Sequence, residues 1–136
     1  YASCCEPLKL DTPTIICGLD TVIAGNIDHM ADYCLTADRQ AIPRDPIFRE
    51  KQCNAIQLVP AGQKAALWDR FDGQNDMDWA NANPHSVIDD LWPGEVMSYR
   101  EQILHFGWDG VRIAYFHGRL KPHELEGDQM IQRHWR

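Results

Sequence analysis

The sequence predicts a small α+β domain in which about four strands form a mostly antiparallel sheet and three or four helices pack on it. The first observation is composition: 136 residues, of which 44% are hydrophobic and 24% charged, are enough for one folded domain with its own core. The second is that strand-like and helix-like segments are interspersed, with strands at both ends of the chain. The third is that all five cysteines lie in residues 1–53 and none in residues 54–136. We therefore expect a single domain over residues 1–136, stapled by disulfides in its N-terminal part.

Four segments have the features of strands. Residues 7–17 are expected to form an extended arm that ends in the β-branched run 14–17, and residues 55–59 form a short apolar run stopped by Pro60. Residues 111–116 follow an Asp-Gly turn and alternate between two faces, which makes them the clearest strand. Residues 129–135 are expected to form a last strand at an edge of the sheet.

Helical spacing of apolar residues predicts helices over residues 21–34, 63–71 and 93–106, with a short capped turn at residues 86–92. Gly25 lowers the stability of the first helix by about 1 kcal/mol relative to alanine, which is too little to end it. The expected core combines apolar residues of these helices and strands: Ile15, Ile23, Ile27, Met30, Leu58, Leu67, Phe71, Ile103, Val111, Ile113 and Tyr115.

The cysteine distribution and the start of the chain at Tyr1 predict a mature secreted protein. The adjacent pair Cys4 and Cys5 at one end of the chain favours an exported, bridged protein over an intracellular one with reduced, buried thiols. The first fifty-three residues would then be the stapled part of the domain.

The expected helix over residues 21–34 restricts the disulfide pairing. Such a helix rises about 20 Å, whereas a bridge needs Cα atoms within about 7 Å, so Cys17 and Cys34 cannot pair. Neighbouring cysteines do not readily pair with each other either. We predict that Cys4 and Cys5 bridge Cys34 and Cys53, in an order left open, and that Cys17 is a free, buried thiol.

Charge is unevenly distributed along the chain. The formal net charge is −7, and residues 71–99 contain six carboxylates without a lysine or arginine. Such a stretch repels phosphate backbones and anionic membranes, and no apolar run approaches the ~20 residues that span a bilayer. We expect neither a nucleic-acid partner, unless the protein is a nuclease, nor a membrane partner. A basic partner protein fits the charge best.

The acidic segment from residue 72 to residue 84 is the predicted binding surface. It is polar and irregular, and Asp72, Asp76 and Asp78 flank Trp79, a residue type that often anchors protein interfaces. The alternative is that Trp79 fills the core beneath its own loop. The aspartate spacing invites comparison with a calcium-binding EF-hand, but Met77 occupies the position that needs glycine. No metal site and no cofactor is expected.

The C-terminal third supplies a candidate catalytic set. His117, Glu124 and Arg119 could act as base, acid and phosphate-binding cation in metal-independent cleavage of a phosphodiester, as in ribonucleases. Glu124 and Glu126 also have the Glu-x-Glu spacing of arginine-directed ADP-ribosyltransferases. Gly127 interrupts the strand on which that pair should lie, so this alternative is set aside.

Taken together, the short chain, its clustered cysteines and the lack of a strong catalytic motif resemble the general type of secreted effector or toxin-like proteins of microbes. The sequence therefore predicts a protein that acts by binding a partner protein. A small ribonuclease-type hydrolase is the alternative. A pocket that gathers His117, Arg119 and Glu124 would favour the enzyme.

Overall fold

Two β-sheets, rather than one, organise the protein. The computed structural model describes residues 5–135 and pairs the strands of the first sheet in the order β1-β4-β3-β5. Its strands are β1 (Thr14–Cys17), β4 (Ile56–Val59), β3 (Gln40–Ile42) and β5 (His85–Val87). The second sheet has the order β2-β7-β6. Its strands are β2 (Val22–Ile23), β7 (Ile113–Tyr115) and β6 (Val96–Ser98).

Each sheet combines antiparallel and parallel pairs. In the first sheet β4 runs antiparallel to both β1 and β3, while β5 runs parallel to β3. In the second, β2 is antiparallel to β7 and β6 is parallel to it. The strands span only two to four residues, so most of their stability must come from side-chain packing on the sheets.

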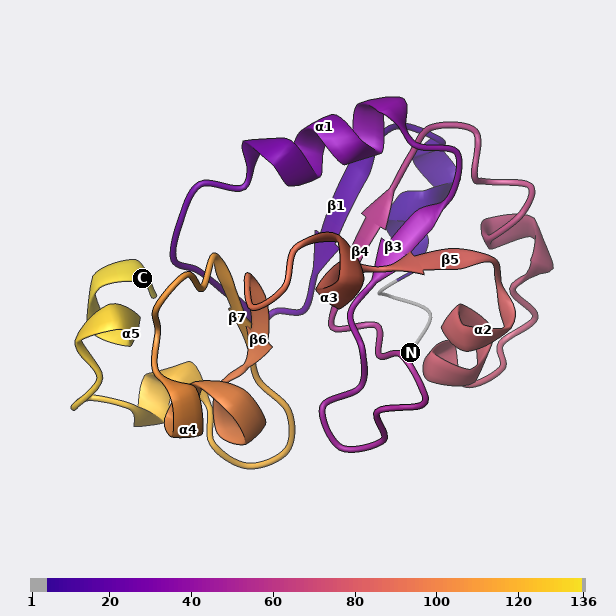
Figure 1. Cartoon of the computed structure of the whole chain (residues 1–136). Coiled ribbons are helices and arrows are strands. Elements are labelled where there is room, and N and C mark those ends of the chain that lie inside the picture. The colour runs from indigo at the N-terminus through magenta and orange to yellow at the C-terminus, as the bar shows by residue number, and fades with distance from the viewer. Residues whose placement is uncertain (1–4, 136) are drawn as a thin grey trace.

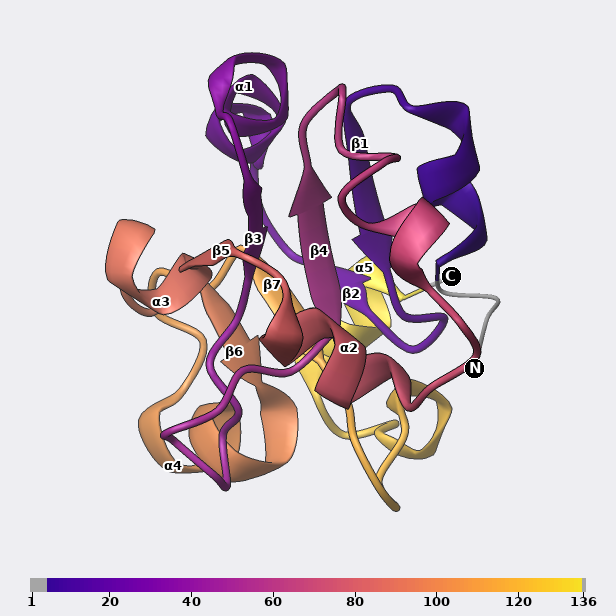
Figure 2. The same cartoon turned by 90° about the vertical axis from the view of Figure 1, so that its right-hand side faces the viewer.

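Five α-helices and several tighter or wider helical turns surround the sheets within the described residues (Figure 1). The α-helices are α1 (Asp28–Thr36), α2 (Asp76–Ala82), α3 (Ile88–Leu91), α4 (Leu104–Phe106) and α5 (Gln129–His134). The other turns are η2 (Glu6–Leu10), η3 (Trp68–Arg70), η4 (Tyr99–Ile103) and η5 (Pro122–Glu124). Helix α1 packs against β1 and β4, and Figure 2 shows β1, β4 and β3 next to one another below it. None of the helices in residues 5–135 has the length and apolar character needed to cross a bilayer.

A shared core joins the two sheets. Ile56 and Leu58 from the first sheet and Val96 and Ile113 from the second are all buried in one cluster. Met30 of α1 closes the same cluster. The protein is a small single domain of mixed α and β structure. Its strands form a four-stranded and a three-stranded sheet, so the predicted single, mostly antiparallel sheet of about four strands is wrong.

The predicted disulfide staple is wrong. No disulfide joins Cys5, Cys17, Cys34 and Cys53 to one another, and Cys4 lies outside the described residues. Cys5 is buried in a different core cluster from Cys34 and Cys53. Cys17 is a half-buried thiol on β1. Because the described cysteines form no disulfide with one another, they no longer support export, and secretion stays a prediction.

The predicted strands at residues 14–17, 55–59 and 111–116 are confirmed in their central residues as β1, β4 and β7. The predicted strand over 129–135 is wrong, because it forms helix α5. The Asp128 side chain accepts hydrogen bonds from the first amides of that helix and so caps it.

The predicted helix over residues 21–34 is cut short. Val22 and Ile23 form strand β2, and the helix begins only at Asp28. The backbone amides of Ala24 and Gly25 donate to the carbonyl oxygen of Arg112 on the neighbouring segment. A Cβ on Gly25 would lie 2.7 Å from the Arg112 side chain, so this close approach requires glycine.

Two further helix predictions are also cut short, and one segment predicted to be irregular is helical. Residues 63–71 retain only the 3-10 turn η3, and residues 93–106 divide into β6, η4 and α4. Residues 72–84 were expected to be irregular but contain helix α2. The Asn75 side chain caps this helix, because its oxygen accepts hydrogen bonds from the backbone amides of Met77 and Asp78. Pairing of β6 with β7 interrupts the predicted helix over residues 93–106, and capping by Asn75 favours helix α2.

Candidate functional site

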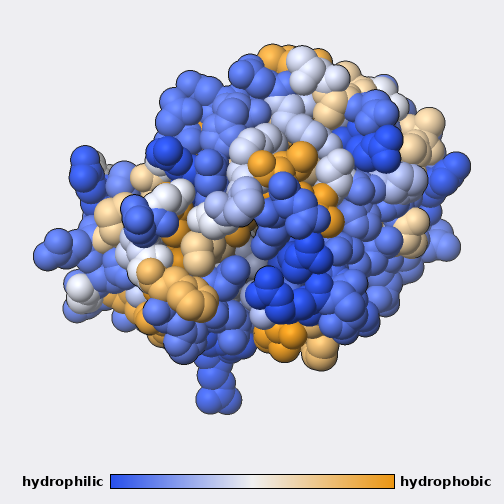
Figure 3. All heavy atoms as spheres, viewed as in Figure 1, coloured by the Kyte–Doolittle hydropathy of each residue, from blue (hydrophilic) through white to orange (hydrophobic). Residues whose placement is uncertain are grey.

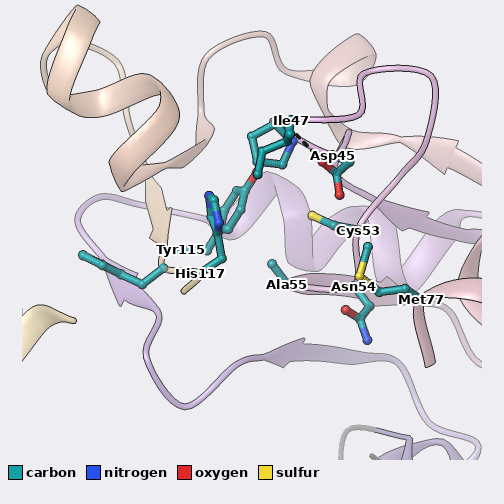
Figure 4. A pocket seen from close by; sticks show the side chains of 10 residues that line it. Asp45, Ile47, Cys53, Asn54, Ala55, Met77, Tyr115 and His117 are labelled. Carbon is teal, nitrogen blue, oxygen red and sulfur yellow. Dashed lines mark hydrogen bonds between the residues drawn. The ribbon is translucent and has the colours of Figure 1, made fainter. Parts of the chain in front are cut away.

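A pocket of about 300 Å³ lies where the two sheets meet. Its walls come from the loop after β3, the segment before β4, the end of β7 and helix α2. The lining residues are 45–47, 53–55, 115–117 and Met77. Figure 4 shows their side chains converging on one space from these separate segments. Most of the wall is apolar, and Asp45, Asn54, Tyr115 and His117 supply its polar groups.

Asp45 is held rigidly at one side of this pocket. Its Oδ1 accepts hydrogen bonds from the backbone amides of Ile47 and Phe48, both at 2.8 Å. Its own amide donates to the carbonyl oxygen of Lys51 at 2.9 Å. An aspartate that binds its own following amides forms a tight turn, and Pro46 favours that turn. The side chain is therefore fixed by the loop it stabilises.

The second oxygen of Asp45 has a different environment. Asp45 is only 8% exposed, yet its Oδ2 accepts no hydrogen bond from residues 5–135. In Figure 4 one oxygen of Asp45 is joined to Ile47 by a dashed line, and the other points toward the side of the pocket that holds Cys53. The charge of Asp45 acts on Cys53, Tyr115 and His117 in the pocket wall. The pocket therefore contains one carboxylate oxygen that is available to a ligand.

Cys53 and Tyr115 line the opposite wall. Burial, with a smaller contribution from the nearby carboxylates of Asp45 and Asp89, raises the pKa of Cys53 to about 11. Burial also raises the pKa of Tyr115, whose hydroxyl lies against the Cys53 thiol. Both groups are protonated at neutral pH, so neither is an activated nucleophile.

His117 is tied to its own sheet. Its Nε2 lies 2.8 Å from Ser98 Oγ, and its Nδ1 lies 3.5 Å from a guanidinium nitrogen of Arg100. Because a guanidinium can only donate, Nδ1 is the acceptor, and the proton is assigned to Nε2, which donates to Ser98. Burial and the Arg100 charge lower the pKa of His117 and keep the ring neutral. In this tautomer His117 cannot take a proton from Ser98, so the pair is not a nucleophile with its base.

The predicted catalytic set does not come together. His117 lines the pocket, whereas Arg119 and Glu124 are exposed and line no part of it. The Glu124 carboxylate accepts a hydrogen bond from the backbone amide of Lys121 and so stabilises the start of η5. The polar partners of His117 are Ser98 and Arg100 rather than the two residues expected.

The predicted acidic binding surface is also divided. Asp72 and Asp78 are exposed, whereas Asp76 accepts a hydrogen bond from Asn54. Trp79 is 2% exposed and packs edge-on against Phe71, with ring centroids 5.7 Å apart. It fills the core beneath its own segment and offers no ring to a partner.

Residues 5–135 contain no group of three histidine, cysteine or acidic side chains placed to hold a metal ion. Comparison with known proteins assigns no family: no family model matches the chain, and no curated protein matches it.

Sequence reasoning missed Asp45 and the loop that carries it. The motif Pro43-Arg44-Asp45-Pro46 is a turn signal and could have marked Asp45 as a residue that caps its own turn. Residues 53–55 lie near Asp45 because the β3–β4 connection folds back on itself, with Arg44 paired to Gln52. No local signal could show that residues 115–117 also line the pocket, because they belong to the other sheet.

Proposed function

We propose that the protein acts by binding a partner protein, and that the pocket between the sheets receives one side chain of that partner. The observation that carries the proposal is the pocket itself. It is apolar over most of its wall, its thiol and phenol are protonated, and the ring of His117 is hydrogen-bonded to Ser98, while Asp45 offers one carboxylate oxygen to a ligand. Such a site favours binding over catalysis.

The size of the pocket supports a side chain as the occupant. About 300 Å³ is at the small end of the range for sites that hold drug-sized ligands, and it fits one long side chain. Two exposed apolar residues of the same loop, Ile47 at 52% and Phe48 at 57%, extend the apolar surface beyond the pocket. In Figure 3 most of this face is hydrophilic, with small apolar groups, one of them at the lower edge near the loop between β3 and β4.

The test is selection of binding peptides followed by affinity measurement. A random peptide library displayed on phage is selected on the immobilised protein, and the affinities of enriched peptides are measured by calorimetry. We expect the peptides to share one anchor residue and to bind Ile47→Asp at least tenfold more weakly. Leu19→Asp is the matched control, because Leu19 is 99% exposed and lies outside the pocket lining.

Enriched peptides that bind wild type and Ile47→Asp equally well would contradict the proposed site. Failure to enrich any peptide would contradict the binding function. Cleavage of RNA by the wild type that is lost in His117→Ala would favour the hydrolase alternative instead.

A further inference from the structure

We propose that the side chain received by the pocket is a lysine, whose ammonium group donates to Oδ2 of Asp45. This inference rests on the proposed function and names the chemistry of the partner. It starts from the unusual position of Asp45, which carries a charge at 8% exposure.

A buried charge is costly unless a charge or hydrogen bonds compensate it. None of the ion pairs formed within residues 5–135 includes Asp45. Arg44, the residue before Asp45, does not neutralise this charge, because its guanidinium forms an ion pair with Asp90 at 2.7 Å. One carboxylate oxygen is compensated by two amides, and the other faces the pocket. A cation supplied from outside would complete the site.

The geometry distinguishes between the two basic side chains. Arginine binds carboxylates best through two parallel hydrogen bonds, one to each oxygen. At Asp45 the amides of Ile47 and Phe48 already occupy Oδ1, which leaves a single acceptor. An ammonium group is a compact donor that needs only one oxygen, so the site favours lysine over arginine.

The remaining wall fits the stem of a lysine. Ile47, Met77 and the ring of Tyr115 present apolar surface along which four methylene groups can be buried. Close to the pocket, exposed Arg49 and Lys51 repel a cation, whereas Glu50 between them and the net charge of −7 attract one. Contact with Asp45 is what makes the pocket itself selective for the ammonium group.

The test uses four short acetylated, amidated Gly-X-Gly peptides in which X is lysine, acetyl-lysine, arginine or norleucine. Binding is measured by titration of amide NMR shifts. We expect the lysine peptide to shift the amides of residues 45–48 and 115–117. It should bind at least tenfold more tightly than the acetyl-lysine and norleucine peptides and more tightly than the arginine peptide.

Two variants isolate the charge. Asp45→Asn keeps an oxygen for the Ile47 and Phe48 amides and should reduce lysine binding at least tenfold, with norleucine binding unchanged. Glu50→Gln removes one negative charge from an exposed position of the same loop and should change lysine binding less than twofold. If Asp45→Asn does not fold, the acetyl-lysine comparison on the wild type tests the same interaction.

Equal binding of the lysine and norleucine peptides at the pocket would overturn the lysine inference and leave the proposed function intact. Absence of any shift in the pocket amides would overturn the inference as well. The phage selection then decides separately whether the protein binds a partner at this site.

Discussion

The fold changes the chemistry of Cys53. It precedes β4, faces the pocket and lies in the core shared by the two sheets. Burial raises its pKa from an ordinary value of 9.0 to about 11. The thiol is therefore protonated at neutral pH and packs as a small apolar side chain.

This shift predicts a loss of stability at alkaline pH. Above about pH 9 the unfolded chain releases the Cys53 proton, whereas the folded protein keeps it until about pH 11, so the free energy of unfolding falls across this window. The stabilisation is complete below pH 9, and its loss amounts to at most about 3 kcal/mol for two pH units. Urea unfolding at pH 8, 9, 10 and 11 measures the slope, and Cys53→Ala should show a shallower one. Equal slopes would show that Cys53 titrates normally in the folded protein.

Asp128 fixes the C-terminal elements to one another. Its Oδ1 caps α5 by accepting a hydrogen bond from the Met130 amide. Its Oδ2 accepts hydrogen bonds from the Tyr99 hydroxyl at 2.7 Å and from the Trp108 indole nitrogen at 3.1 Å. One carboxylate thus joins the helix to η4 and to the segment before β7. The same residue explains why residues 129–135 form a helix, although their composition alone suggested an edge strand.

We expect Asp128→Ala to lower the free energy of unfolding by about 2–4 kcal/mol. The substitution removes the cap of α5 and leaves the Tyr99 hydroxyl and the Trp108 indole nitrogen without their acceptor. Asp128→Asn keeps an oxygen for the cap and should cost less. Thermal and urea unfolding measure both. A cost below about 1 kcal/mol for the alanine variant would mean that α5 is not held by this contact.

At the scale of the whole molecule, Ile113 tests how the two sheets are joined. It is fully buried on the central strand of the second sheet and belongs to the cluster that contains β4 of the first. Its partner in the register is Ile23 on the edge strand, which is 46% exposed. The two isoleucines share a sheet and differ in burial.

Ile113→Ala should therefore lower the free energy of unfolding by about 2–5 kcal/mol. Ile23→Ala is the matched control and should cost about 1 kcal/mol or less, because its side chain is half exposed. Denaturant titration of both variants measures the difference. Similar costs for the two substitutions would contradict a core shared between the sheets.

The sequence by itself determined which segments are buried and three of the strands. Residues 14–17, 56–59 and 113–115 could be predicted because β-branched or alternating apolar runs bounded by turn residues are local signals. Most of the expected core is buried as well, including Met30, Leu58 and Ile113.

Only the tertiary structure decided how these segments combine. Strand β2 has two residues, too few for any periodicity, and exists because Val22 and Ile23 pair with β7 about ninety residues later. The five cysteines suggested a staple, yet no disulfide joins the four described ones to one another, and Cys5 lies in a different core cluster from Cys34 and Cys53. The pocket depends on loops that local patterns cannot place opposite each other. Its carboxylate and its apolar walls come from distant parts of the chain, and packing of one sheet against the other brings them together.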